Sequence, residues 1–140
     1  QLADWWYEYA RKAIDSARPL LVQLAERYPL VLVSNFYGNI ESVLKDFGLD
    51  HLFGAIVESA VVGIRKPDPA IFRLGVDKLG FPADEIVVVG DSYDKDIVPA
   101  TRIGCQTIWL KSIGWSAYKG NETADIVLSD FTEIKQVFAL

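Results

Sequence analysis

The sequence predicts an α/β fold, in which a parallel sheet carries helices on both of its faces. Short apolar runs alternate along the 140 residues with segments that have helix start and stop signals. The runs are rich in β-branched residues and lack polar alternation, which is typical of strands covered on both faces. Such strands, joined through helices, form right-handed crossovers in a parallel sheet.

Five strands are expected, and each is a short apolar run. Leu30–Val33 is the clearest example, because it is continuous, apolar and largely β-branched. No linker rich in Pro, Gly or Ser separates the runs. The expected strands are residues 30–33, 55–57, 86–89, 106–110 and 126–128.

Helices are expected between the strands, each ended by a glycine that can adopt a left-handed conformation. Two more open the chain, because Pro19 suits the first turn of a second helix. A final helix follows Asp130, which is placed to form a capping box with Glu133. The expected helices before that one are residues 5–16, 19–28, 39–47, 68–80 and 94–103.

Composition narrows the functional classes. The formal net charge is −5 and no cluster of Lys and Arg is present, which argues against nucleic-acid binding. No apolar run approaches the roughly 20 residues that a membrane span needs, and the first residues lack the layout of a signal peptide. The single cysteine, Cys105, excludes an intrachain disulfide. We therefore expect a cytoplasmic protein without membrane or nucleic-acid partners.

Polar side chains follow three of the expected strands. Ser34 and Asn35 follow the first strand, Lys66 lies in the loop after the second, and Asp91 and Asp96 follow the third. Ligands in open α/β sheets bind outside the carboxyl ends of the strands, so we expect these side chains to meet there. A hydroxyl, a cation and a carboxylate cluster together indicate magnesium-dependent phosphate chemistry.

The acidic segment GDSYDKD at residues 90–96 needs either solvent or a cation, because its carboxylates repel one another. Mg²⁺ takes oxygen ligands and few protein carboxylates. Asp91, at the strand end, is the best ligand candidate. Asp96 is the second metal-site acid, which would hold a coordinated water or orient Lys66. Asp94 is expected to face solvent and cap the following helix.

Charge on a phosphoryl group would be neutralised by the other two segments. Ser34 would donate its hydroxyl to one phosphate oxygen, and the backbone around Asn35 and Phe36 would donate N–H groups. Lys66 would supply a fixed positive charge. The substrate class that follows is a small phosphorylated metabolite.

Three segments resemble motifs of one known family. VLVSNF (31–36), RKPDPAIF (65–72) and VVVGDSYDKDIVPATRIGC (87–105) resemble the second, third and fourth motifs of the haloacid dehalogenase-like hydrolase superfamily. Their order and spacing resemble its phosphatase branch, and the likeness covers nearly everything from Pro19 to the C-terminus. The resemblance implies a Rossmann-like core and hydrolysis through an aspartyl-phosphate.

The same resemblance implies a role for each candidate residue. It implies that Ser34 binds phosphate, that Asn35 helps to hold the substrate, and that Lys66 stabilises charge. It implies that Asp91 binds Mg²⁺ and that Asp96 is the second acid of that motif. By this reading Lys66, Ser34 and Asp96 are catalytic, while Asp91 and Asp96 form the metal site.

One motif of that superfamily is missing. Its first motif, Asp-x-Asp at the end of a central strand, carries the nucleophile, and no such strand precedes Val31. Asp94 and Asp96 have this spacing but belong to the fourth motif. The resemblance places the missing strand between those at Val31 and Val87, so we expect a gap at the centre of the sheet.

The missing motif suggests part of a longer hydrolase. Residues 1–17, with four aromatic side chains between Trp5 and Tyr9, would be the remnant of a helical cap domain, and residues 18–140 a partial core domain. We expect this chain alone to be inactive. Its expected partners are a missing N-terminal segment or a second copy in a strand-exchanged dimer.

Alternatives remain open at this point. A metal-free 2-haloacid dehalogenase would use the same fold, although the carboxylate cluster disfavours it. A non-catalytic binding or scaffold protein would also lack the first motif. Ser34 and Asn35 would otherwise serve only as turn residues, and Lys66 as a solvated lysine. Trp109, Trp115 and Tyr118 would either border the site or pack in a core or dimer.

Overall fold

The structure is a computed structural model that describes residues 2–111 and 122–140. For residues 2–13 it describes the helix but not the side chains, so the aromatic residues from Trp5 to Tyr9 lie outside the described side chains. Trp115 and Tyr118 lie outside the described residues. Among the residues that are described, no helix combines the length and the apolar character needed to cross a membrane.

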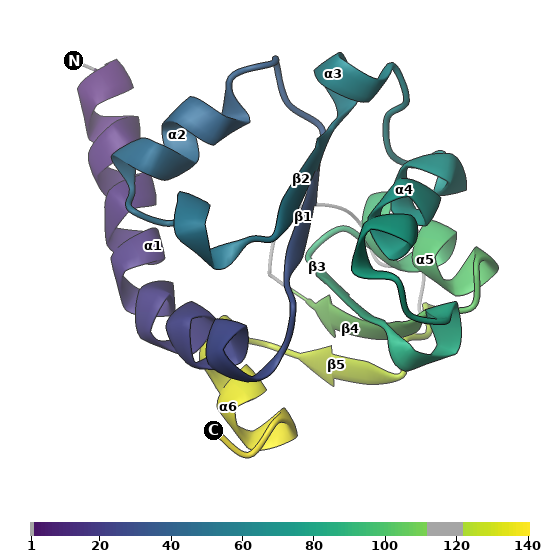
Figure 1. Cartoon of the computed structure of the whole chain (residues 1–140). Coiled ribbons are helices and arrows are strands. Elements are labelled where there is room, and N and C mark those ends of the chain that lie inside the picture. Colours follow the sequence, from purple (N-terminus) through teal and green to yellow (C-terminus); the bar gives the residue numbers. More distant parts are fainter. Residues whose placement is uncertain (1, 112–121) are drawn as a thin grey trace.

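The strands are all parallel, which confirms the predicted α/β class (Figure 1). They form two separate sheets, one of β1 and β2 and the other in the order β3-β4-β5. Each predicted strand is present within one or two residues of its expected bounds. The strands are β1 (Val31–Ser34), β2 (Ala55–Glu58), β3 (Val87–Gly90), β4 (Gln106–Leu110) and β5 (Ile126–Leu128).

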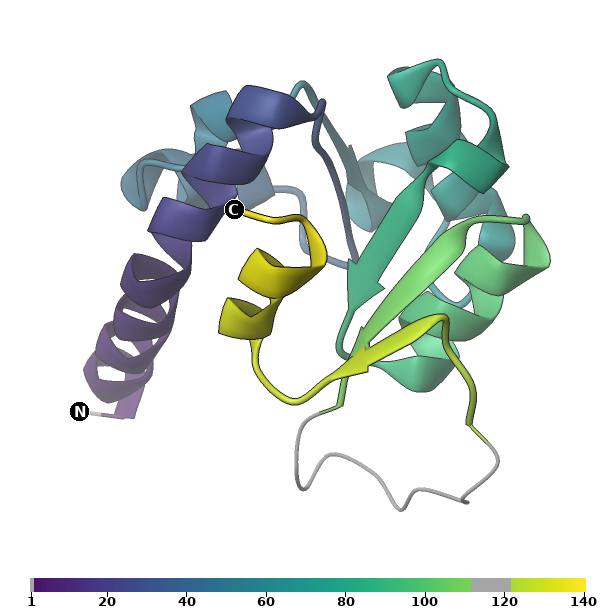
Figure 2. The ribbon, with the colours of Figure 1, turned by 90° about the horizontal axis from the view of Figure 1, so that it is seen from below.

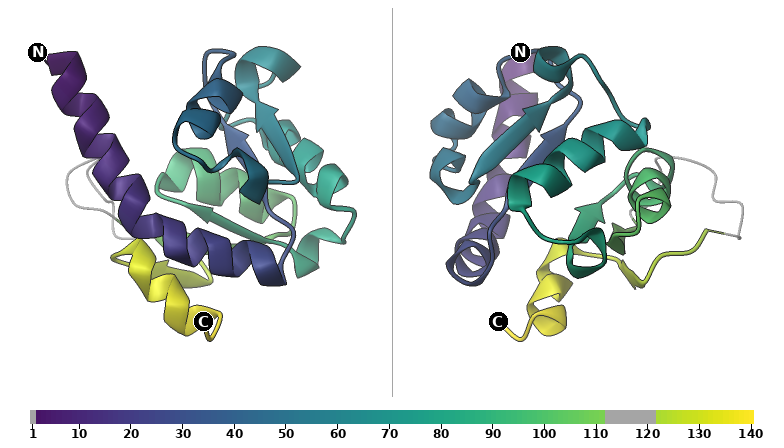
Figure 3. Two further views of the ribbon diagram at one scale, coloured as in Figure 1. Left: turned by 60° about the vertical axis from the view of Figure 1, so that its left-hand side comes forward. Right: turned by 45° about the vertical axis from the view of Figure 1, so that its right-hand side comes forward.

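The division between the sheets falls between β1 and β3, where the sequence predicted a gap. The right-hand view of Figure 3 shows the two groups of strands apart. Every residue of β1 is only half-buried, and Val89 of β3 is 38% exposed. Strands predicted to be covered on both faces are thus partly open in the described part of the chain.

Helix α1 (Leu2–Arg27) is a single helix, so the prediction of two helices separated at Pro19 was wrong (Figure 3). Proline inside a helix removes one backbone hydrogen bond and costs about 3 kcal/mol. Burial of Leu20 and Leu24 outweighs this cost, because both side chains pack into the body of the molecule. The expected boundary at residue 17 falls inside this helix, and the assignment of residues 1–17 to a cap stays a prediction.

Helix α4 (Pro69–Leu79) confirms its predicted limits. The Asp68 side chain accepts a hydrogen bond from the Ala70 N–H at the start, and Gly80 ends the helix with φ of 76°. The capping box of Asp130 and Glu133 is also present. The other α-helices are α2 (Ile40–Asp46), α3 (Ser59–Val62), α5 (Val98–Arg102) and α6 (Ile134–Val137).

The helix expected over 94–103 has a different start. A π-helical turn over Tyr93–Ile97 comes first and α5 continues from it. Ser92 is the N-cap, because its hydroxyl accepts from the Lys95 N–H. Asp94 is exposed, as predicted, but the prediction that it caps the helix was wrong.

Helices cover both faces of the β1–β2 sheet. On one face, Val57 packs against Ile71 and Phe72 of α4. On the other, Leu32 and Ile56 pack against a core formed by α1, α2 and the segment after α2. The alternation along the strands places successive side chains on opposite faces.

The second sheet is covered in the same way. Leu24 of α1 and Ile134 of α6 pack against Ile108 and Leu128 of the strands. Figure 2 shows α6 between α1 and this sheet. On the other face, α5 and the end of α4 surround Cys105, which is buried as predicted. Burial raises the pKa of the Cys105 thiol, so it stays protonated in the core.

Candidate active site

The candidate site lies where β1, β2 and β3 end. Ser34 is the last residue of β1, and Lys66 lies in the turn between α3 and α4. The Nζ of Lys66 donates to Oδ1 of Asp96 at 2.7 Å. The two side chains are 16% and 8% exposed, so the ion pair is mostly removed from water. The structure therefore brings together the cation after β2 and the acid after β3.

Asp96 is held by backbone as well as by Lys66. Its Oδ2 accepts from the Ser92 N–H at 3.2 Å, so each carboxylate oxygen has a donor. The π-helical turn brings the carboxylate back over Gly90. A Cβ at Gly90 would lie 2.5 Å from Oδ2 of Asp96, so only glycine fits there. Sequence reasoning missed this role of Gly90. The available signal was a glycine at the end of a strand, directly before the acidic residues.

Asp91 is exposed, and no hydrogen bond or ion pair engages its carboxylate among the described residues. Its backbone carbonyl accepts from Nε1 of Trp109 at 3.2 Å. Trp109 is 2% exposed, so it packs in the core and also holds the Asp91 backbone. Its ring lies 5.1 Å from that of Tyr93, which sits in the same acidic segment.

The donor set fits Mg²⁺ with one direct carboxylate. Asp91 offers free oxygens, and Mg²⁺ commonly takes only one or two carboxylates with waters and phosphate oxygens. In the described part of the chain, no group of three or more His, Cys, Asp and Glu side chains is placed to hold a metal ion. Asp96 already serves Lys66 and Ser92, so a direct bond from it to metal would compete with both.

Ser34 has no hydrogen-bond partner for its hydroxyl within the described residues, and it is half-buried at the strand end. Its hydroxyl is therefore available to a ligand. The Phe36 N–H is not available, because it donates to Oγ of Ser59 at 3.0 Å. The expectation that the Phe36 backbone binds phosphate is thus not supported.

The side chain of Asn35 has a different partner from the one expected. Its Nδ2 donates to the Lys66 carbonyl at 3.1 Å, and its Oδ1 accepts from the Lys66 N–H at 2.8 Å. The side chain that was predicted to hold substrate instead binds the backbone of Lys66. Direct substrate binding by Asn35 stays a prediction.

Sequence reasoning missed Glu58, a carboxylate buried to 5% exposure at the end of β2. It lies opposite Ser34 in the sheet. Its Oε2 accepts from the N–H groups of Gly38 at 2.6 Å and Ile40 at 3.2 Å. Glu58 therefore fixes the loop after Ser34 and the start of α2. An acid ending an apolar strand was the available signal.

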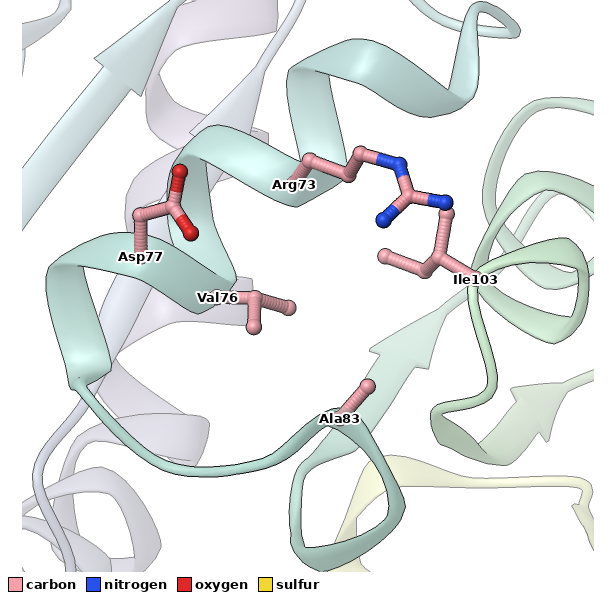
Figure 4. Close-up of a pocket in the computed structure, with 5 residues that line it drawn as sticks. All are labelled: Arg73, Val76, Asp77, Ala83 and Ile103. Atoms are coloured by element: carbon pink, nitrogen blue, oxygen red, sulfur yellow. The ribbon is translucent and has the colours of Figure 1, made fainter.

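A hollow of about 270 Å³ lies elsewhere, between α4, Ala83 in the turn before β3, and Ile103 after α5 (Figure 4). Ala83 precedes β3 and Ile103 precedes β4, so the hollow lies at the amino ends of these strands. None of the predicted site residues lines it. Its lining residues are Arg73, Val76, Asp77, Ala83 and Ile103.

Comparison with known families identifies the family of the chain. Residues 5–104 match the family model described as haloacid dehalogenase-like hydrolase. The chain belongs to the haloacid dehalogenase-like hydrolase family. The match includes the segments of Ser34, Lys66 and Asp91, which resemble motifs of this family.

Two kinds of relative illustrate the family. The chain is 32% identical over 138 residues to phosphoserine phosphatase from Thermus thermophilus, covering 96% of the chain and 55% of that enzyme. It resembles the crystal structure of a HAD phosphatase from Thermococcus onnurineus, with 28% identity, a TM-score of 0.76, and coverage of 86% of this chain and 55% of that one.

A 2-haloacid dehalogenase from Pseudomonas syringae is also similar, with 27% identity and a TM-score of 0.72, covering 86% of this chain and 50% of that one. The chain thus spans about half the length of each of these three proteins. Both phosphatases and dehalogenases of the family share its fold.

Proposed function

We propose that this chain carries the phosphate-binding and metal-binding part of a magnesium-dependent phosphohydrolase that acts on a small phosphorylated metabolite in the cytoplasm. The observation that supports this most is the Lys66–Asp96 ion pair, together with a Ser34 hydroxyl and an Asp91 carboxylate that have no hydrogen-bond or ion-pair partner among the described residues. These groups come from the ends of three strands. Together they offer a phosphoryl group a cation, a neutral donor and a metal ligand.

Each side chain has a distinct task in this mechanism. The Lys66 ammonium faces the negative charge of the phosphoryl oxygens, and Asp96 holds it in place. The Ser34 hydroxyl donates to another oxygen. Asp91 would hold Mg²⁺, which neutralises charge on the phosphoryl group when bound. Catalysis of this kind consists largely of positioning and charge neutralisation.

The nucleophile would come from outside this chain, on a strand between β1 and β3. Within the residues that the structure describes, β1 pairs with β2 alone and β3 pairs with β4 alone. A strand ending in Asp-x-Asp would pair with both. Its first carboxylate would attack phosphorus as the bond to the leaving oxygen breaks, and its second acid would protonate that oxygen. Water would then hydrolyse the aspartyl-phosphate.

Dehalogenation is the second candidate, since a dehalogenase shares the fold. The free Asp91 carboxylate favours phosphate chemistry. An unpaired carboxylate beside an anionic substrate repels it, and a metal-free dehalogenase has no metal ion to neutralise Asp91, whereas Lys66 is already paired with Asp96. The names of relatives, among them phosphoserine phosphatase, support the same choice.

The test supplies the missing strand. The chain is mixed with a synthetic apolar peptide ending in Asp-x-Asp, with an Asn-x-Asp peptide as control, and offered a phosphate ester or a 2-haloacid with and without Mg²⁺. The proposal expects ester hydrolysis only with the Asp-x-Asp peptide and Mg²⁺, and no activity of the chain alone. Haloacid turnover without metal would support the dehalogenase instead. Peptide binding without either activity would support a scaffold protein.

A further inference from the structure

The Asn35 side chain forms two hydrogen bonds with the backbone of Lys66, which we call the Asn35 clasp. One bond runs from Nδ2 to the Lys66 carbonyl (3.1 Å), and the other from the Lys66 N–H to Oδ1 (2.8 Å). The amide thus uses its donor and its acceptor on one residue that lies 31 positions away. Because the N–H and the carbonyl belong to the two peptide units on either side of the Lys66 Cα, the two bonds restrain the Lys66 backbone on both sides.

Lys66 needs such support because of where it lies. It is in the turn between α3 and α4, outside any helix or strand. A lysine side chain is long, and holding its ammonium in one place costs conformational entropy. A backbone that also moved would raise this cost further. The clasp therefore removes one source of freedom from the Lys66–Asp96 ion pair.

The clasp also connects parts of the fold that no strand pairing joins. Asn35 directly follows β1, whereas Asp96 follows β3 in the other sheet. Lys66 is bound by Asn35 through its backbone and by Asp96 through its side chain. A chain of hydrogen bonds thus runs from the end of β1 to the end of β3.

We infer that Asn35 is a positioning residue whose clasp holds Lys66 so that its ammonium stays on Asp96. The consequence for phosphate binding rests on the proposed function, but the effect on the ion pair does not.

The first test uses the unaltered chain. Nuclear magnetic resonance detects scalar coupling across a hydrogen bond, here between the Lys66 amide nitrogen and the side-chain carbonyl carbon of Asn35. The inference expects this coupling, together with slow exchange of the Lys66 amide proton. Rapid exchange without coupling would overturn the inference, whatever the behaviour of any variant.

The second test compares Asn35→Ala with Asp125→Ala. Asp125 also binds backbone, accepting from the Thr107 N–H at 2.8 Å at the amino end of β4, so its loss is a matched control for stability. The readout is the ¹⁵N–¹H signal of the Lys66 ammonium, assigned by its disappearance in Lys66→Arg. The inference expects Asn35→Ala to broaden or shift this signal and Asp125→Ala to leave it unchanged. An unchanged signal in folded Asn35→Ala would overturn it.

Binding of inorganic phosphate with Mg²⁺ gives the functional consequence. Asn35→Ala removes both bonds of the clasp, and we expect it to weaken phosphate binding about tenfold, which corresponds to about 1.4 kcal/mol. Asp125→Ala should bind as the unaltered chain does. If the ammonium signal moves but the unaltered chain binds no phosphate, the clasp is upheld and the proposed function fails.

Discussion

Lys66 and Asp96 form an ion pair between segments that follow different sheets. Both side chains are mostly buried, so each charge has lost most of its hydration. The attraction between the two charges compensates for this loss. Arg18 and Asp15 form the contrasting case, a helical pair whose side chains are 37% and 49% exposed. Pairs of the second kind contribute little, because water screens them.

Replacing Lys66 should therefore destabilise the chain more than breaking the surface pair. We expect Lys66→Met to lower the free energy of unfolding by about 3 kcal/mol, because it leaves the Asp96 carboxylate buried without its cation. Asp15→Asn should change it by less than about 1 kcal/mol. Urea unfolding followed by circular dichroism measures both. Equal effects would show that the Lys66–Asp96 pair is as screened as the surface pair.

Replacing Gly90 should destabilise the chain for a steric reason. Gly90→Ala places a methyl group 2.5 Å from Oδ2 of Asp96, so the carboxylate must move. We expect a loss of about 1–3 kcal/mol in unfolding free energy and a displaced Lys66 ammonium signal. Gly54→Ala is the control, since the nearest atom there is 3.8 Å away. A Gly90→Ala chain as stable as Gly54→Ala would contradict this account.

The site was predictable from sequence only in part. Lys66 and Asp96 were expected to meet because parallel strands end at the same edge. The partner of Asn35 was not foreseen, because an amide after a strand can face a ligand or another loop, and only the folded path of the Lys66 turn decides between them. Glu58 was overlooked, since an acid at a strand end usually faces solvent.

At the scale of secondary structure, local signals succeeded where a residue has one preferred role. Asp68 and Gly80 delimit α4 as predicted, because a cap and a left-handed glycine act within one turn. Pro19 failed as a signal. Proline favours the first turn of a helix, but the burial of Leu20 and Leu24 along one continuous helix outweighs this local preference.

Helix α1 should become more stable without its proline. Pro19 is exposed, so Pro19→Ala loses no buried contact and restores a backbone hydrogen bond. We expect a gain of about 1–3 kcal/mol, measured as a higher urea midpoint. Pro69→Ala at the first turn of α4 is the control and should bring no such gain. Equal gains would mean that α1 is interrupted at Pro19.

The start of α2 should depend on Glu58. Glu58→Ala removes the acceptor of two backbone N–H groups, and we expect a loss of about 1–3 kcal/mol. Glu58→Gln keeps an acceptor oxygen and should lose less. Amide exchange at Gly38 and Ile40, measured beside urea unfolding, locates the effect. Unchanged exchange at both amides in Glu58→Ala would contradict this role.

At the scale of the whole molecule, the two sheets explain why the strand runs are less buried than their composition suggests. β1 and β3 have the sequences of interior strands, yet neither has a ladder partner on its second side within the described residues. The sequence indicated the gap between β1 and β3 only through the missing Asp-x-Asp motif. The structure shows the gap directly, because β1 and β3 belong to two sheets that pair separately. Unpaired strand edges invite association.

We therefore expect the chain to self-associate through these edges, or to bind a parallel strand. Sizing chromatography should show a dimer that becomes monomeric when the apolar Asp-x-Asp peptide is added. A monomer that unfolds cooperatively and does not bind the peptide would show that the strand edges are closed in solution.

The central claim is that the ends of β1, β2 and β3 form one phosphate site. Its most direct measurement is residue-resolved nuclear magnetic resonance during addition of inorganic phosphate with Mg²⁺. The account predicts that signals of Ser34, Lys66 and Asp91 shift together and saturate at one concentration. Shifts confined to Arg73 and Asp77 in the opposite hollow, with these three signals unmoved, would contradict it.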